Sequence, residues 1–252
     1  MSGHSKWHNI KLRKGKADAQ RGALFTKLSK EIILAAKGGS PDPEANYRLK
    51  MAVEKARENN MPQDNIKRAI ARATGADGAK EIEEIRYEGY GPAGVAAIVD
   101  AATDNRNRTA AELRFLFSRH GGALGETGSV GWIFEPRGLL EVENGKLDED
   151  ALTEAALVDG VVDVHYGTGG ERSEVVTEPA ELAAVRERLS SAGLHVTSML
   201  LGVEPKQTVA PSGEELRAVV EFLDALEEHE DVQRVFLNAE LDLAQLEALA
   251  AS

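Results

Sequence analysis

The stretch EIRYEGYGPAGVAAIVDAA, residues 84–102, decides the fold class of this chain. Residues 84–90 have the composition of a β-strand, Gly91-Pro92 is a turn signal, and residues 94–102 form a run of Val, Ile and Ala typical of a buried strand. Helical periodicity precedes this stretch, and strands alternate with helices after it. We therefore expect a small helical domain followed by α+β domains.

Three short amphipathic helices are predicted before this stretch. The first covers residues 19–37 and ends at two glycines, because glycine tolerates the left-handed cap. The second is expected to begin at Asp42, with Pro43 in its first turn, and the third to run from Pro62 to Gly75. Their brief connections indicate an all-helical domain, which residues 76–79 link to the rest.

After residue 102, strand and helix patterns recur in units typical of small, mostly antiparallel sheets with helices on one face. Helices are predicted at 108–120, 147–158, 179–192 and 213–229, and strands at 161–166, 174–177, 195–201 and 232–237. Residues 132–135 and 139–143 are expected to pair as a hairpin around Pro136-Arg137-Gly138.

Length and composition bound the class of protein. The 252 residues fit two or three domains, and a hydrophobic content of 42% is enough for real cores. The absence of cysteine excludes disulfides and thiol chemistry. No run approaches the roughly 18 apolar residues of a membrane span, and no apolar segment follows the basic N-terminus as in a secretory signal. We expect a cytoplasmic protein with no membrane partner.

The charge is split along the chain. Residues 1–80 hold 17 Lys and Arg against 8 Asp and Glu, a net charge of +9, whereas residues 81–252 hold 13 against 34, a net charge of −21. Such a split favours a basic module that meets nucleic acid and an acidic remainder that stays off it. A solvated basic helix face is the alternative.

The first thirty residues are strongly basic, with Asp18 as their one anion. The candidate nucleic-acid-binding residues here are Lys6, Trp7, Lys11, Arg13, Lys14, Lys16, Arg21 and Lys27. Lysines and arginines near phosphates add sequence-independent, salt-sensitive affinity, and Trp7 has the chemistry to stack on an unpaired base. The alternative for Trp7 is burial in the helical domain. His4 and His8 have a zinc-compatible spacing but no nearby third ligand, so no metal is expected.

The run from Asp104 to Thr109 lies between a predicted strand and a predicted helix. Arg106 and Arg108 are candidate phosphate ligands there, since a helix N-terminus offers free N–H groups and arginine adds forked donors. The alternative is that Asn107 or Asp104 caps the helix and the arginines pair with local acids.

Nucleotide and catalytic motifs are absent. The glycine-rich segment 121–131 has neither the GxxxxGK[ST] nor the GxGxxG pattern, so we expect a mobile interdomain connection there. Serine-hydrolase elbows, HExxH and Cys–His pairs do not occur in the sequence. We therefore expect no enzyme, no cofactor and no small-molecule substrate.

Several longer strings resemble one known family. They are Gly3-His4-Ser5-Lys6-Trp7, Arg21-Gly22, Phe25-Thr26-Lys27, Asn60-Met61-Pro62, Tyr87-Glu88-Gly89-Tyr90-Gly91-Pro92, Asp104-Asn105-Arg106-Asn107-Arg108-Thr109, Gly121-Gly122-x-Leu124-Gly125 and Gly128-Ser129-Val130. With these strings, which span essentially the whole chain, the sequence resembles the YebC family, to which the mitochondrial translational activator of cytochrome oxidase is related.

The resemblance implies a domain plan. It consists of a basic helical domain at 1–79, an α+β sandwich at 80–131 plus 205–240, and a second α+β sandwich at 132–204 inserted into the first.

The resemblance also implies a non-enzymatic, nucleic-acid-binding regulator of gene expression. One version is a DNA-binding transcriptional regulatory protein. The other is a ribosome-associated translation factor that binds ribosomal RNA and relieves stalling, for example on proline runs. The motifs do not separate these two roles.

Overall fold

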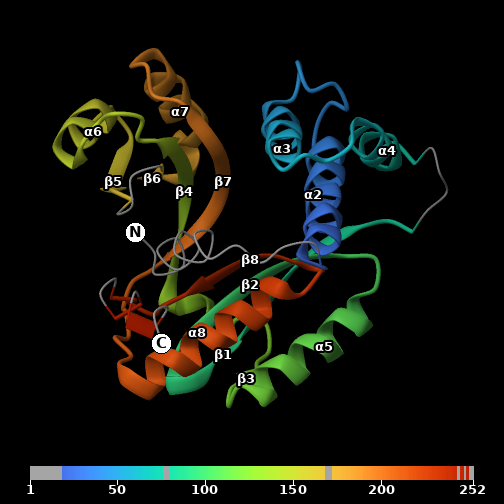
Figure 1. The fold of residues 1–252 in the computed structure, drawn as a ribbon, viewed down its shortest axis with the longest axis vertical. Helices are drawn as coiled ribbons and strands as arrows, with labels where there is room; N and C mark the ends of the chain where they lie inside the picture. Colours follow the sequence, from blue (N-terminus) through green and yellow to red (C-terminus); the bar gives the residue numbers. More distant parts are fainter. Residues whose placement is uncertain (1–18, 76–79, 168–171, 243–244, 247, 250–252) are drawn as a thin grey trace. The chain divides into compact units, whose positions relative to one another are not determined.

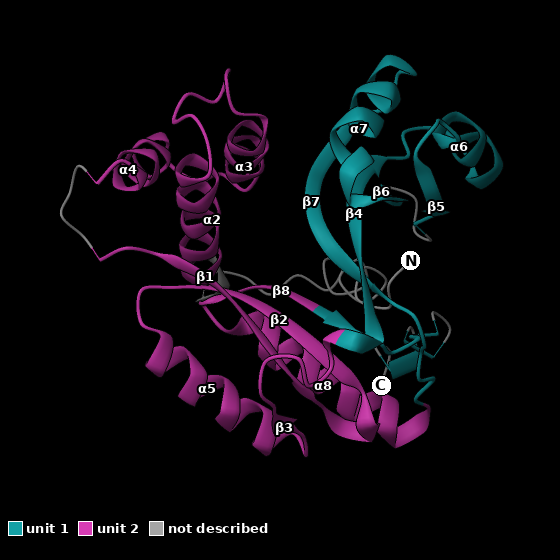
Figure 2. Ribbon diagram, turned by 180° about the vertical axis from the view of Figure 1, so that it is seen from behind, with its two compact units in different colours: residues 1–14, 132–211, 236–252 teal, residues 15–131, 212–235 magenta. Residues whose placement is uncertain are grey.

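The computed structural model describes residues 19–75, 80–167, 172–242, 245–246 and 248–249, and it gives the backbone alone for residues 19–21. The described chain divides into two compact units, which we call unit 1 and unit 2 (Figure 2). Unit 1 is drawn from 132–211 and 236–252, and unit 2 from 15–131 and 212–235. The predicted linker at 76–79 lies outside the described residues.

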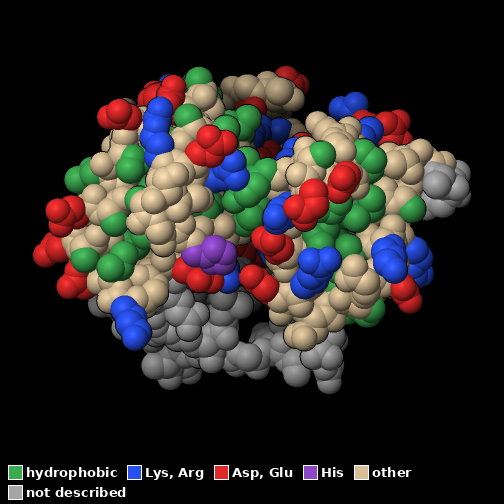
Figure 3. All heavy atoms as spheres, turned by 90° about the horizontal axis from the view of Figure 1, so that it is seen from above, with side chains coloured by type: hydrophobic (Ala, Val, Ile, Leu, Met, Phe, Trp, Pro, Cys, Tyr) green, Lys and Arg blue, Asp and Glu red, His purple; other side chains and the backbone are tan. Residues whose placement is uncertain are grey.

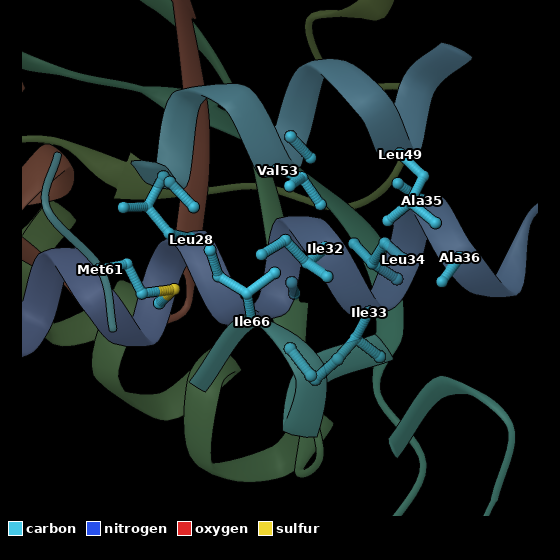
Figure 4. Close-up of a cluster of buried hydrophobic side chains, with 14 of the residues drawn as sticks. Leu28, Ile32, Ile33, Leu34, Ala35, Ala36, Leu49, Val53, Met61 and Ile66 are labelled. Atoms are coloured by element: carbon cyan, nitrogen blue, oxygen red, sulfur yellow. The ribbon is translucent and has the colours of Figure 1, made fainter. Parts of the chain in front are cut away.

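The described part of unit 2 begins with three helices (Figure 1). They are α2 (Ala19–Lys37), α3 (Tyr47–Glu58) and α4 (Gln63–Ala73). Their apolar faces meet in one buried cluster (Figure 4), whose members include Leu28, Ile32, Leu49, Val53 and Ile66. Helix α2 has the bounds that the periodicity predicted, because the two glycines after Lys37 end it.

Helix α3 begins at Tyr47, not at the predicted Asp42. The reason is Asn46, whose side chain acts as the N-cap and accepts a hydrogen bond from the Leu49 amide at 3.1 Å. The same side chain donates to the Ala35 carbonyl oxygen at 2.9 Å and so ties the preceding turn to the end of α2. The prediction for the start of α3 was therefore wrong.

The first four-stranded sheet has the strand order β3-β1-β2-β8. Its strands are β1 (Glu83–Tyr90), β2 (Ala96–Thr103), β3 (Ala123–Leu124) and β8 (Val232–Leu237). The deciding stretch of sequence forms β1 and β2, which pair antiparallel around the short helix η1 (Pro92–Gly94). Every residue of β2 is buried, as the continuous apolar run predicted.

Two helices lie on one face of this sheet (Figure 1). They are α5 (Arg106–Arg119) and α8 (Gly213–Glu228), and Phe117 meets Phe222 edge to face with ring centroids 4.9 Å apart. The helical core reaches the sheet through Ala102, which belongs to the same buried cluster as α2. The sheet is thus fixed between α5 and α8 and the three N-terminal helices.

The second four-stranded sheet lies in unit 1 and has the order β5-β6-β4-β7, with all neighbouring strands antiparallel. Its strands are β4 (Phe134–Glu143), β5 (Val161–His165), β6 (Arg172–Thr177) and β7 (Val196–Pro205). Helices α6 (Glu149–Ala156) and α7 (Leu182–Ser191) pack against it around Leu140, Leu152 and Val185.

The hairpin predicted around 136–138 is wrong, because β4 is one strand of ten residues. Pro136 and Gly138 suggested a turn. The pairing explains why they are tolerated: β6 accompanies β4 only from Gly138 onward, so at Pro136 the strand pairs with β7 alone. Proline is compatible with such a local edge, since its missing N–H faces no partner strand.

The element order confirms the predicted fold class of a helical N-terminal region followed by two α+β sandwiches. The chain leaves the first sheet after β3, builds the whole second sheet, and returns with α8 and β8. The second sheet is therefore inserted in the first. The exact boundaries 1–79, 80–131 plus 205–240, and 132–204 stay predictions. Among the described helices, none combines the length and apolar character needed to cross a bilayer.

Candidate nucleic-acid interface

Most of the predicted basic arm lies outside the described residues. This applies to Lys6, Trp7, Lys11, Arg13, Lys14 and Lys16, to the side chain of Arg21, and to the histidine pair His4 and His8. The structure does place three predicted site residues, Lys27, Arg106 and Arg108.

Lys27 lies on α2 and is turned toward the protein. Its Nζ donates a hydrogen bond to the carbonyl oxygen of Glu227, in the last turn of α8. A cation is favoured there, because the C-terminal end of a helix carries a partial negative charge. The neighbouring Lys30 donates to the carbonyl oxygen of Glu230 at 3.1 Å. These contacts attach α2 to the segment that joins α8 and β8.

Asp231 is the buried centre of this attachment. Its carboxylate accepts hydrogen bonds from Lys30, from Thr109 Oγ1 at 2.6 Å and from Arg108 Nη2 at 2.8 Å, and its side chain is fully buried. Burial would raise the pKa of Asp231, but the hydrogen bonds from Lys30, Thr109 and Arg108 outweigh it and lower the pKa to about 2. Asp231 is therefore ionised and holds α2, α5 and β8 together.

Arg108 takes part in this structural network. Besides Asp231, its guanidinium lies 3.5 Å from Asp104 and 3.9 Å from Glu112. Arg106 differs, because it is exposed and forms no ion pair with any described acid. The helix is capped by Asn105, whose side chain accepts from the Arg108 amide at 3.2 Å. Neither Asn107 nor Asp104, the two predicted caps, has this role.

The cations of helix α4 have no acidic partner among the described residues. Its three basic residues are Lys67, Arg68 and Arg72, and none forms an ion pair with a carboxylate within the described ranges. Lys67 and Arg68 are exposed, and Arg68 donates to the Asp64 carbonyl oxygen at 3.3 Å and to Asn65 Oδ1. Arg72 is half-buried and donates to the Lys80 carbonyl oxygen at 3.0 Å.

The basic residues of α2 and α3 contrast with those of α4, because several are matched by acids. The pairs are Lys37–Glu81, Arg48–Glu84, Lys50–Glu44 and Lys55–Glu31. On the face shown in Figure 3, Lys and Arg side chains are likewise interspersed with Asp and Glu. Helix α3 also has one exposed arginine without an ion pair to a described carboxylate, Arg57, so α4 differs from α2 and α3 in that none of its cations is matched.

The glycine-rich segment after α5 is anchored, in contrast to the mobile connection that the sequence suggested. The carboxylate of Glu88 accepts hydrogen bonds from the amides of Gly128 (2.9 Å), Val130 (2.9 Å) and Gly131 (2.7 Å). Burial acts to raise the pKa of Glu88, but the three amides together with Arg86 lower it. Because these loop amides already bind the carboxylate of Glu88, they are not available to bind a phosphate. The sequence carries no local signal for this contact.

Two clusters combine a histidine with two carboxylates. In Glu112–His229–Asp231, the histidine Nε2 lies 3.0 Å from Glu112, while Lys30 and Arg108 already neutralise Asp231. Both clusters are occupied by basic side chains of the protein itself, which argues against a metal there.

The second cluster, Asp163–His165–Glu204, belongs to unit 1. The imidazole lies between the two carboxylates, with Nδ1 3.7 Å from Asp163 and Nε2 3.4 Å from Glu204. Opposite ring nitrogens thus face the two acids, and Arg137 Nε lies 3.5 Å from Glu204. Each ring nitrogen faces a different carboxylate, and Arg137 already lies beside Glu204, which argues against a metal ion in this cluster.

Comparisons with known proteins agree with this architecture. A family model described as "TACO1/YebC protein N-terminal domain" matches residues 5–76, and one described as "TACO1/YebC second and third domain" matches residues 82–239. These matches confirm the family resemblance noted in the sequence.

Two similar relatives are each named "Probable transcriptional regulatory protein". One, from Pelotomaculum thermopropionicum, is 48% identical over 244 residues, covering 96% of this chain and 100% of the relative. The other, from Rubrobacter xylanophilus, is 50% identical over 242 residues and covers 96% of both chains.

A solved structure is similar as well. The crystal structure of the conserved hypothetical protein Aq1575 from Aquifex aeolicus has a TM-score of 0.81 and 44% sequence identity, and the match covers 89% of this chain and 92% of that one. The fold, the two family-model matches and the full-length relatives together establish that this chain belongs to the TACO1/YebC family.

Proposed function

We propose that this protein is a non-enzymatic, nucleic-acid-binding regulator of gene expression, and that it acts as a DNA-binding transcriptional regulatory protein. Its relatives carry the name of probable transcriptional regulatory proteins. The observation that carries the nucleic-acid part is the exposed pair Lys67 and Arg68 on α4, which no described carboxylate neutralises. Unneutralised cations on one helix favour a polyanion partner.

The basic arm extends this interface in our proposal. Lys6, Lys11, Arg13, Lys14, Lys16 and Arg21 contact phosphates and release counterions, while Trp7 stacks or packs beside them. Arg106 adds an exposed cation at the start of α5. Lys27 and Arg108 position the interface and do not touch the phosphates. Their side chains are already bound to the Glu227 carbonyl oxygen and to the Asp231 carboxylate.

A ribosome-associated translation factor that binds ribosomal RNA is the second candidate. Trp7 within a basic segment favours it, since aromatic side chains recognise unpaired bases and folded RNA exposes many of them. Both candidates use the same cations, so the target has to be determined by binding.

The test compares the full-length protein with a Lys67→Ala/Arg68→Ala variant. Binding to duplex DNA and to purified ribosomes is measured across a series of salt concentrations. Each lost phosphate contact reduces the slope of log K against log salt by about 0.9 for duplex DNA, so the double variant is expected to lose close to two units. Lys146→Ala/Arg217→Ala is the matched control, since it removes two exposed cations from other surfaces.

The outcomes separate the two candidates. The DNA-binding proposal is supported if the protein binds duplex DNA and the slope of log K against log salt falls in the Lys67→Ala/Arg68→Ala variant but not in the control. Ribosome binding without duplex binding overturns it in favour of the translation factor. A wild-type protein that binds neither target refutes both.

A further inference from the structure

Phe115 is an exposed aromatic ring in the middle of α5. Its side chain is 62% exposed, whereas Phe117, two residues later on the same helix, is fully buried. Four exposed residues lie one helical turn away from Phe115: Ala111 and Ser118, which are small, and Glu112 and Arg119, which are charged. The ring of Phe115 is therefore not one of the buried core side chains.

Two arginines flank the ring on the outward side of α5. Arg114 and Arg119 are exposed, and in the described ranges neither forms an ion pair. Arg108 on the same helix is different, since three carboxylates surround it. One acid, Glu112, shares this face, and it lies 3.9 Å from Arg108 Nε. The two arginines outnumber this acid, so the surface around Phe115 is locally cationic although the whole chain is acidic.

Arg114 and Arg119 lie on opposite sides of the ring. A helix rises about 1.5 Å and turns about 100° per residue, so the two arginines are roughly 7.5 Å apart along the axis and about 140° apart around it, with Phe115 between them. One base on the ring with a phosphate on either side fits this arrangement.

We propose that the outward face of α5 binds single-stranded nucleic acid, with Phe115 stacking on an unpaired base and Arg114 and Arg119 binding the flanking phosphates. The inference rests on the proposed nucleic-acid-binding function and adds a contact surface separate from α4 and the basic arm. A single strand is favoured over a duplex, because bases inside a duplex are not available for stacking on a side chain.

A protein partner fits this surface less well. Protein interfaces need a broad apolar centre, and Phe115 is an isolated ring among small and charged residues. It is also the only large hydrophobic residue of α5 that is exposed to this degree. Cations beside a single ring are instead the combination found on sequence-tolerant single-strand binders.

The test uses the full-length protein and three labelled probes: a 12-nucleotide RNA, the same sequence as single-stranded DNA, and its duplex. Phe115→Ala is expected to weaken binding of one or both single strands about 5- to 150-fold, the range for one lost base stack, and to leave duplex binding unchanged. Leu157→Ala is the matched control, because Leu157 is a 69% exposed apolar residue of unit 1. Comparing the affinities for the RNA probe and the single-stranded DNA probe shows which of the two this face binds.

The arginines are tested separately. Arg114→Ala/Arg119→Ala is expected to flatten the salt slope for single strands by about 1.4, with Lys146→Ala/Arg217→Ala as the control. Melting curves verify that each variant folds, which is expected because the altered side chains are exposed.

Unchanged single-strand binding in both α5 variants, with a wild type that binds, overturns this inference alone. A wild type that binds no probe at all refutes the proposed function as well. If the variants instead abolish a wild-type dimer seen by sedimentation, the face is a protein interface and the inference is wrong.

Discussion

Two buried carboxylates, Glu88 and Asp231, each collect three hydrogen-bond donors from remote segments. Asp231 accepts a hydrogen bond from Lys30, which is 201 residues away in the sequence. Glu88 accepts hydrogen bonds from the backbone amides of a loop some forty residues later in the chain. Helical and strand periodicity predict which face of an element is buried, but they carry no information about a partner at such separations. Neither centre could be predicted from the sequence for that reason.

The ionisation of Asp231 makes stability depend on pH. Its pKa is about 2 in the folded protein and near 3.8 when unperturbed, so the stabilisation is complete above pH 4 and is lost as the pH falls toward 2. We expect Asp231→Asn to lower the free energy of unfolding by about 3 kcal/mol at pH 7, because Lys30 and Arg108 lose their partner. Urea unfolding should show a clearly smaller difference between variant and wild type at pH 2.5.

The control for this prediction is Glu44→Gln. Glu44 is 79% exposed and pairs with Lys50 at 3.5 Å, so its replacement is expected to change stability by less than about 1 kcal/mol. A difference between Asp231→Asn and wild type that does not vary with pH would contradict the assigned role of Asp231.

Glu88 should govern the local opening of the glycine-rich loop. Glu88→Gln replaces one carboxylate oxygen by an NH2 group that cannot accept from the amides of Gly128, Val130 and Gly131. We expect hydrogen exchange of these amides to accelerate about 10-fold or more, since hydrogen bonds to charged groups are among the stronger ones. Glu84→Gln, an exposed change on the same strand, should leave them unchanged; equal acceleration in both variants would refute the assignment.

At the scale of elements, most helices and strands could be predicted, and the errors have identifiable causes. Helix α2 and the β1–β2 pair follow directly from apolar periodicity and glycine signals. The false hairpin in β4 arose because a Pro-x-Gly pattern cannot show that the strand loses one neighbour at that point. The caps of α3 and α5 were misplaced because several Asn and Asp residues compete near each start.

The start of α5 offers a direct comparison of two asparagines. Asn105→Ala removes the side-chain acceptor of the Arg108 amide and is expected to destabilise the protein by about 1 kcal/mol. Asn107→Ala lies inside the exposed first turn and should be neutral or slightly stabilising, since alanine has the higher helix propensity. The midpoints of thermal unfolding of the two variants are compared. If Asn107→Ala is less stable than Asn105→Ala, the cap is Asn107.

At the scale of the whole molecule, the charge split and the fold class could be read from the sequence, whereas the use of individual cations could not. Lys27 and Arg108 looked equivalent to other basic residues, yet they bind Glu227 and Asp231. Lys67 and Arg68 are exposed and unmatched by described acids. Only packing distinguishes these cases, because it brings acids from distant segments to some cations and not to others. Phe115 carries no sequence signal for its proposed role, because helical periodicity indicates which positions are buried and not what an exposed ring contacts.

The insertion of one sheet into another has a consequence for the newly made chain. About 130 residues separate β2 from β8, the strand that covers its edge, and a ribosome adding about 5–20 residues per second needs roughly 6 to 26 s to make them. The inserted sheet can close during that interval, because all its strands lie between Phe134 and Pro205. The apolar strand β2 meanwhile keeps one edge unpaired. Products that end before residue 232 retain this open edge permanently, and they are the forms of this protein most prone to aggregate.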